Sequence, residues 1–283
     1  MGRKVEINST EKVDRMRQMD FKGKVCVVTG GALGIGRCIT REFAKMQASI
    51  AFIDVDEQAG QQNLKWLTAH GCNALFFCGD IAEEAVLQDF TSAVITKFGK
   101  VDYLINNACI SRKGILSGCG YDDFNYVLRV GVTAPYLLVR LFLPYFNLQA
   151  AIVNISSTRA TMSQADTESY TAAKGGISAL THALAVSLSH KVRVNAICPG
   201  WIDTGAYYDE EYQPCYTQSD TAQHPSGRVG NPYDIARVAM FLCHSDSGFI
   251  NGESITVDGG MTHLMIYDND AGWKYQQQEA NDD

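Results

Sequence analysis

Short apolar runs and longer amphipathic segments alternate along this chain. Residues 24–29, 49–54 and 73–78 are short runs with almost no polar interruption, and this pattern is typical of strands buried on both faces. Residues 37–46 and 56–70 separate them and have helical spacing of their apolar positions. The alternation predicts an α/β domain with a parallel sheet and helices on both faces.

The same pattern continues to the end of the domain. It predicts helices over residues 82–97, 122–146, 172–188 and 231–243, and strands over 102–108, 151–155, 192–197 and 254–257. Gly131 and Pro135 are expected to break the helix 122–146. Residues 205–226 form a long loop rich in tyrosine, for which we expect a lid and, as the alternative, a poorly ordered insertion.

Three segments are predicted. Residues 1–20 are expected to form a polar arm, which is either loose or docked on the domain or on a neighbouring subunit. Residues 21–262 are expected to form a single domain, and residues 263–283 a tail. We expect the tail to dock as far as Trp273 and its last ten residues to be disordered.

A glycine-rich turn follows the first predicted strand and leads into a helix. The next strand ends in Asp54, which lies 18 residues after the last glycine of the turn. Glycines allow close approach of a ligand, the helix start offers free N–H groups to an anion, and the acid suits ribose hydroxyls. This order predicts a dinucleotide site; the residues of the turn are Gly30, Leu33, Gly34, Ile35 and Gly36.

Asp54 also bears on the choice of cofactor. A carboxylate attracts free ribose hydroxyls and repels a 2′-phosphate, and Leu33 supplies no compensating cation. We therefore expect NAD(H) rather than NADP(H). Other polar residues at predicted strand exits, Asp80 and Asn107, would face the same crevice or serve only as turn residues.

Ser157, Tyr170 and Lys174 are the candidate catalytic residues. The separation of four places Tyr170 and Lys174 on one helix face, where the ammonium favours the phenolate over the phenol. A hydroxyl at the end of the preceding strand would hold a substrate oxygen. The spacing Tyr-x-x-x-Lys is common by chance. Taken alone, it is more simply interpreted as part of an ordinary amphipathic helix, and the catalytic interpretation depends on the other motifs of the chain.

Composition excludes several other functions. The formal charge of −7 argues against a surface that binds nucleic acid. The sequence contains no run of 18 apolar residues, so we expect no membrane span. The nine cysteines are scattered without a Cys-x-x-Cys pair, and the six histidines lack metal-ligand spacing. We expect reduced thiols, no metal, no signal peptide and a cytoplasmic protein.

Taken together, these motifs resemble the short-chain dehydrogenase/reductase family over residues 24–260. The motifs that support this resemblance are, in order along the chain, Thr29-Gly30-x-x-x-Gly34-Ile35-Gly36, Asp54, Asp80-Ile81, Asn106-Asn107-Ala108, Ser157, Tyr170-x-x-x-Lys174, Pro199-Gly200 and Val257-Asp258-Gly259-Gly260. The resemblance implies a doubly wound, Rossmann-type sheet of seven parallel strands, hydride transfer with a nicotinamide, and a homotetramer.

The resemblance also implies roles for individual residues. Ser157, thirteen residues before Tyr170, would be the catalytic serine rather than Ser156, and Tyr170 the general acid/base. Lys174 would lower the pKa of Tyr170 and bind the nicotinamide ribose. The expected cofactor contacts are Gly30, Leu33, Gly34, Ile35, Gly36, Asp54, Asp80, Ile81, Asn107, Tyr170, Lys174, Pro199, Gly200, Ile202 and Thr204.

One position departs from the family pattern. The family carries an asparagine, which holds a water in the proton path, where this chain has Gly131. We expect a modified relay in which the freed Gly131 carbonyl and a second water replace the amide.

The substrate is expected to be a small molecule held by Ser157, Tyr170, Trp201 and Tyr207. Aromatic side chains suit a flat apolar molecule, and the terminal extensions resemble those of some bacterial hydroxysteroid dehydrogenases. The expectation is therefore a secondary alcohol/ketone oxidoreductase acting on a hydroxysteroid such as a 20β-hydroxysteroid. A sugar or polyol dehydrogenase, a 3-oxoacyl reductase and a non-catalytic NAD(H) sensor are the alternatives.

Overall fold

A seven-stranded parallel sheet forms the centre of the molecule in the computed structural model, which describes residues 20–209, 211–267 and 269–270. The strand order is β3-β2-β1-β4-β5-β6-β7. The strands are β1 (Val25–Thr29), β2 (Ser49–Asp54), β3 (Ala74–Cys78), β4 (Val101–Asn106), β5 (Phe146–Ile155), β6 (Val192–Pro199) and β7 (Ser254–Val257). The predicted doubly wound sheet is confirmed.

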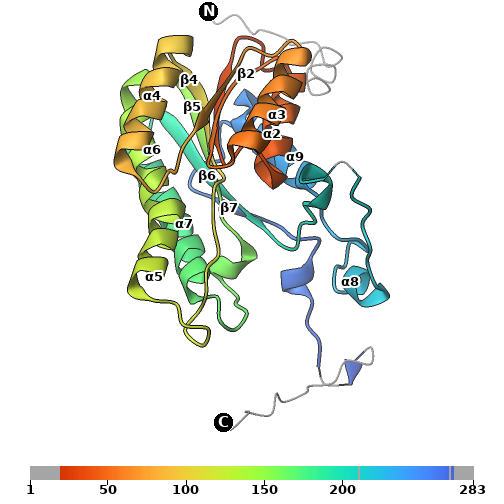
Figure 1. The fold of residues 1–283 in the computed structure, drawn as a ribbon. Coiled ribbons are helices and arrows are strands. Elements are labelled where there is room, and N and C mark those ends of the chain that lie inside the picture. The colour runs from red at the N-terminus through yellow and green to blue at the C-terminus, as the bar shows by residue number, and fades with distance from the viewer. Residues whose placement is uncertain (1–19, 210, 268, 271–283) are drawn as a thin grey trace, which may run out of the picture.

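Helices cover both faces of the sheet (Figure 1). One face carries α2 (Gly34–Lys45), α3 (Glu57–Ala69) and α9 (Pro232–Cys243). The other carries α4 (Glu84–Phe98), α6 (Ala134–Phe142) and α7 (Glu168–Ser187). Each face has its own buried apolar cluster, as expected where strands are buried on both sides.

The strand order reverses direction between β1 and β4, which lie side by side while their crossovers run to opposite sides. Ligands of doubly wound sheets bind beyond the carboxyl ends of the strands at such a point. Thr29 ends β1 and Asn106 ends β4, so the predicted motifs that follow them meet at this edge.

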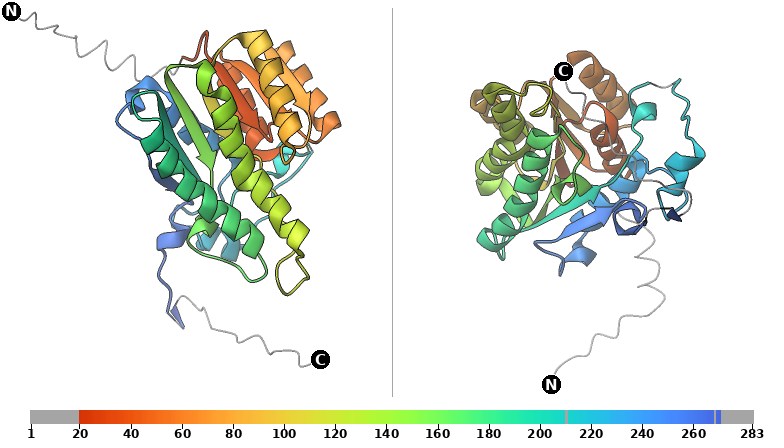
Figure 2. Two further views of the ribbon diagram at one scale, coloured as in Figure 1. Left: turned by 90° about the vertical axis from the view of Figure 1, so that its left-hand side faces the viewer. Right: turned by 90° about the horizontal axis from the view of Figure 1, so that it is seen from below.

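The helix predicted over residues 122–146 is divided. It consists of α5 (Tyr121–Leu128), a π-helical segment (Arg129–Thr133) and α6, followed by a short 3-10 turn (Leu143–Tyr145). The predicted break at Gly131 lies inside the π-helical segment, where the Ala134 N–H donates to the Arg129 carbonyl five residues back. The view in Figure 2 shows this helix and α7 side by side, and the two are in contact.

Residues Tyr121–Tyr145 are also long and apolar enough to cross a membrane, by length and composition alone. The core helix of a soluble protein passes the same test. Here α5 and the π-helical segment pack on α7, and α6 packs on α4, so these residues form part of the domain's own packing.

Two features differ from the sequence-based expectation. β5 begins at Phe146 rather than residue 151, because Phe146 already pairs with Val101 of β4, and an irregularity in the register separates this pair from the one between Tyr103 and Ala151. The long loop contains short helices, a 3-10 turn (Gly205–Tyr207) and α8 (Gln218–Ala222), the latter closed by a capping box between Thr217 and Asp220.

The expected docking of the tail is not found for its described part, because Ile266 and Tyr267 are 42% and 67% exposed. Residues 1–19 and 271–283 lie outside the described residues; they include all but the last residue of the predicted arm, Trp273 and the last ten residues.

Candidate active site

The glycine-rich turn lies directly above the carboxyl ends of β1 and β4. Gly30 and Gly34 have φ angles of +64° and +55°, which side-chain-bearing residues rarely adopt. A Cβ at Gly36 would lie 1.9 Å from the Gly30 carbonyl oxygen, so this glycine permits the close return of α2. The Asn107 amide donates to the carbonyls of Thr29 and Gly30, 3.0 Å each, and fixes the turn to β4.

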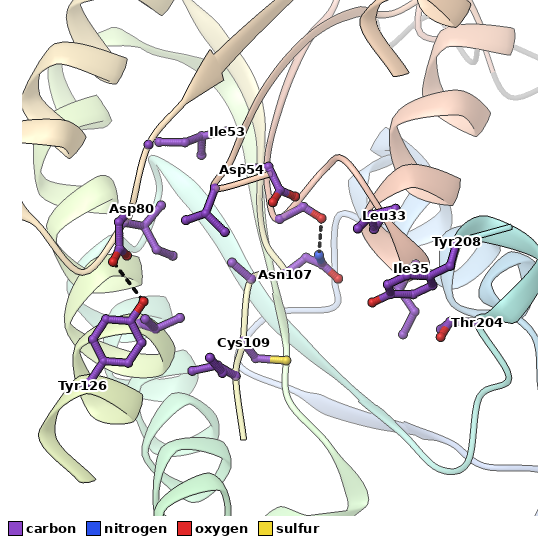
Figure 3. A pocket seen from close by; sticks show the side chains of 18 residues that line it. Leu33, Ile35, Ile53, Asp54, Asp80, Asn107, Cys109, Tyr126, Thr204 and Tyr208 are labelled. Carbon is purple, nitrogen blue, oxygen red and sulfur yellow. Dashed lines mark hydrogen bonds between the residues drawn. The ribbon is translucent and has the colours of Figure 1, made fainter. Parts of the chain in front are cut away.

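A cavity of about 350 Å³ opens between this turn and the exits of β2, β3 and β4 (Figure 3). It brings together most of the predicted cofactor residues. These are Gly30, Leu33, Gly34, Ile35, Asp54, Asp80, Ile81, Asn107 and Thr204. Gly36 instead supports the packing of α2, while Gly200 and Ile202 line a second cavity. Pro199 ends β6 as a buried residue.

The two acids of the cavity are held by backbone N–H groups. One Asp54 carboxylate oxygen accepts from Ala32 N at 2.9 Å, so the carboxylate also holds the glycine-rich turn. Asp80 accepts from Ala82 N at 2.8 Å and from the Tyr126 hydroxyl at 2.9 Å. Sequence reasoning did not anticipate Tyr126, because its partner lies 46 residues away on another element.

These residues fit a dinucleotide. Helix α2 has no side-chain cap at Leu33 and no acidic residue in its first turn, so its first N–H groups lie free beside the cavity. Asp54 would take the ribose hydroxyls at the far end of the cavity. The side chains of Thr204 and Tyr208 lie on the opposite side of the turn from Asp80, beyond Ile35 (Figure 3).

A second cavity, of about 730 Å³, adjoins Ser157 and Tyr170. Most of its side chains are polar: Ser111, Ser157, Thr158, Arg159, Ser163, Gln164, Tyr170 and Gln223. Met162, Trp201, Ile202 and Met261 supply its apolar part. The predicted substrate residues Ser157, Tyr170 and Trp201 are therefore together in one cavity.

Tyr207 is the exception among the predicted substrate residues. It packs against the apolar cluster under α2, and burial together with the neighbouring Cys38 thiol raises its pKa. The structure does not bring it into the second cavity. Its neighbour Tyr208 lies in the first cavity instead, with ring atoms 3.3 Å from the position of a Cβ on Gly34.

Lys174 is buried beneath Tyr170. Its ammonium donates to the Ile155 carbonyl at 2.7 Å and lies 5.3 Å from the centre of the Tyr170 ring. Burial raises the pKa of Tyr170 above its ordinary value, while the Lys174 cation lowers it in part. The predicted effect of Lys174 has the expected sign, but in this structure the burial of the phenol outweighs it.

The two serines at the end of β5 have different surroundings. The Ser156 hydroxyl lies 2.9 Å from the Lys174 carbonyl and 2.8 Å from the Ser178 hydroxyl, which ties β5 to α7. Ser157 lines the second cavity, and its hydroxyl oxygen accepts from Arg159 N at 3.2 Å. Ser157 thus presents its hydroxyl to the cavity, where it also lowers the pKa of Tyr170 by hydrogen bonding, whereas Ser156 ties β5 to α7.

The comparisons with known proteins identify the family. A family model described as enoyl-(acyl carrier protein) reductase matches residues 30–262. An apo SCOR enzyme from Clostridium thermocellum has a solved structure that is 43% identical, with a TM-score of 0.82, over 90% of this chain and 99% of that one. The chain belongs to the short-chain dehydrogenase/reductase family.

Two relatives show the range of this family. An uncharacterized oxidoreductase of Thermotoga maritima is 40% identical over 88% of this chain and 99% of its own length. The L-fucose dehydrogenase of Mus musculus is 35% identical over 85% of this chain and 89% of its own. Members of the short-chain dehydrogenase/reductase family use nicotinamide cofactors, and this chain is therefore an oxidoreductase.

Gly131 is the position at which the resemblance led us to expect an asparagine. A Cβ at Gly131 would lie 2.9 Å from the Ala173 Cβ, closer than carbon atoms approach without displacement. An asparagine side chain at this position would therefore not fit between these helices as they pack here. The replacement of its amide by the Gly131 carbonyl stays a prediction.

Proposed function

We propose that this enzyme interconverts a secondary alcohol and a ketone on a small polyhydroxylated molecule, a sugar or a sugar derivative, using NAD(H). The polar lining of the second cavity carries this proposal, since hydroxyl and amide side chains match a substrate with several hydroxyl groups. Trp201, 39% exposed, would offer its face to a sugar ring. The similarity to an L-fucose dehydrogenase supports the same class.

The hydroxysteroid expectation is not supported. It depended on an aromatic lid that included Tyr207, but this tyrosine packs on the core, and Tyr212 and Tyr216 donate to Asp203. Trp201 is then the one aromatic side chain besides Tyr170 among the described residues that line the cavity. A 3-oxoacyl reductase remains the second candidate, favoured by the acyl-carrier description of the matching family model.

NAD(H) is favoured by the charge of its site. Asp54 lies in the first cavity, which no lysine or arginine lines among the described residues, so nothing there would offset a 2′-phosphate. When bound, the cofactor supplies or accepts the hydride. We also keep a homotetramer in the cytoplasm as a proposal, on the resemblance to the family.

The residues of the chain would act on the substrate oxygen. Ser157 donates a hydrogen bond to this oxygen and orients it, and Tyr170 delivers a proton to it in reduction or removes one in oxidation. Lys174 favours the phenolate form and so assists proton removal. Its buried position, fixed by the Ile155 carbonyl, keeps the cation at one distance from the ring.

The test is a Tyr170→Phe variant assayed against sugars, polyols, oxoacyl thioesters and steroids. We expect the wild type to turn over a polyhydroxylated substrate with NAD+, and the variant to lose roughly 10²- to 10⁴-fold in kcat while NADH binding, measured by fluorescence titration, is unchanged. Tyr136→Phe, at an exposed tyrosine of α6 that lines neither cavity, is the matched control. Turnover of steroids alone would contradict the substrate class, and NADH binding without any turnover would favour a sensor.

A further inference from the structure

The second cavity contains one charged side chain among the described residues that line it, Arg159. The other lining side chains are neutral, and no aspartate or glutamate is among them. An arginine in a cavity otherwise lined by hydroxyl, amide and apolar groups has five N–H donors and a full charge to satisfy. Its surroundings therefore show what kind of group it can receive.

Arg159 is held close to the reacting groups by its own segment. It lies in a 3-10 turn (Thr158–Ala160) that begins directly after Ser157, whose hydroxyl oxygen accepts from Arg159 N at 3.2 Å. The guanidinium carbon lies 5.7 Å from the centre of the Tyr170 ring. The cation and the candidate proton donor are thus within the span of one small molecule.

Neutral groups hold the guanidinium in place without neutralising it. One nitrogen donates to the side-chain oxygen of Gln164, and no ion pair of Arg159 occurs within residues 20–209, 211–267 and 269–270. The nearest acids along the chain are engaged elsewhere. Asp166 accepts from the N–H groups of Leu116 and Ser117, and Glu168 accepts from Ile115 N.

We propose that Arg159 binds a carboxylate of the substrate, so that the preferred substrate is a short polyhydroxylated acid, such as a sugar acid, rather than a neutral sugar. This inference rests on the proposed function and narrows its substrate class. The planar fork of a guanidinium pairs with both oxygens of a carboxylate. A phosphate ester fits less well, because Arg159, the one cation among the described residues that line the cavity, would leave a dianion half neutralised.

The position of Arg159 also limits the length of the substrate. The carboxylate must lie within a few bonds of the carbon that exchanges the hydride, because the guanidinium lies over the face of Tyr170. Ser111, Ser163 and Gln223 line the same cavity and would bind the remaining hydroxyl groups.

The test compares Arg159→Gln with the wild type on matched pairs of substrates, an aldonic or uronic acid and the alditol or sugar of the same configuration. We expect the wild type to prefer the acid. The variant should lose roughly 10- to 100-fold in kcat/KM on the acid, which corresponds to the usual contribution of a charged hydrogen-bonded pair to binding. On the neutral partner the loss in kcat/KM should be clearly smaller, because that substrate has no carboxylate to pair with the guanidinium, so the ratio of kcat/KM for acid over neutral partner is the quantity that decides. Arg159→Lys, which keeps the charge, should restore part of the preference. Arg140→Gln, at an exposed arginine of α6, is the matched control.

Each outcome separates the inference from the proposed function. Turnover of neutral sugars by the wild type with equal or lower activity on the acids would overturn the role of Arg159 and leave the function intact. A preference for sugar phosphates over the carboxylates would overturn the choice of carboxylate. If no sugar compound is turned over, titration of the acid into NADH-loaded wild type and Arg159→Gln still decides, because equal affinities would contradict the inference.

Discussion

Replacement of Gly131 by alanine should destabilise the protein, although alanine is usually the better helix former. The added Cβ would lie 2.9 Å from the Ala173 Cβ, whereas carbon atoms pack at about 3.5–4.0 Å. Overpacking of this kind costs about 1–3 kcal/mol, and the gain in helix propensity offsets up to about 1 kcal/mol. We expect a net loss of about 1 kcal/mol, which lowers the Tm by roughly 2–4 °C for a chain of this size.

Gly175→Ala is the matched control for this change. Gly175 lies in α7, two residues after Ala173, and a Cβ there meets nothing within 4 Å. The same substitution should therefore raise the Tm by roughly 2–4 °C, because about 1 kcal/mol of helix propensity is gained without a clash. Thermal unfolding followed by circular dichroism measures both variants.

A second substitution tests the cause of the Gly131→Ala effect. Ala173→Gly removes the atom that the new Cβ meets, so the double variant should be more stable than the sum of the two single effects by about 1 kcal/mol or more. Additive effects, or a Gly131→Ala variant that gains stability as Gly175→Ala does, would refute the claim of close packing. Ala173 directly precedes Lys174, so a displacement of Ala173 would also displace Lys174. We therefore expect kcat to fall in the Gly131→Ala variant and to recover in the double variant.

Two further changes test the chemistry of the site. Asp54→Asn keeps the acceptor for Ala32 N but removes the charge, so the ratio of kcat/KM for NAD+ over NADP+ should fall by roughly tenfold, and an unchanged ratio would mean that Asp54 only holds the turn. Lys174→Met removes a cation that lowers the pKa of Tyr170, so the pKa should rise and the pH profile of alcohol oxidation should move to higher pH at saturating NAD+. A profile that keeps its midpoint would contradict the coupling of the two side chains.

Local patterns predicted the fold because each buried strand and its exit motif lie close together in the sequence. The run of apolar residues in β1, the turn after it and Asp54 at the end of β2 all belong to one β-α-β unit. Their spacing alone places an acid beside a glycine-rich turn. The start of β5 was missed because polar Asn147 and Gln149 in its first half do not resemble a buried strand.

Contacts between distant segments were not predictable in the same way. Tyr207 and Tyr208 are neighbours in a tyrosine-rich loop, and only the path of the chain decides that Tyr207 packs on the core and Tyr208 lies in the first cavity. The lack of room for a Cβ at Gly131, which would lie 2.9 Å from the Ala173 Cβ, depends on how closely α7 packs on the π-helical segment. Arg159 gave no signal beyond its charge until the second cavity defined its surroundings.

The balance of forces on Tyr170 connects these parts of the site. Burial raises the pKa of the phenol, Lys174 lowers it in part, and Arg159 contributes a smaller lowering from the substrate side. The chain by itself therefore keeps Tyr170 protonated at neutral pH, which is the state that donates a proton to a ketone. A substrate carboxylate paired with Arg159 would cancel the second cation and raise the pKa further. In the proposed mechanism, removal of a proton from an alcohol would then depend on Lys174, whose ammonium donates to the Ile155 carbonyl.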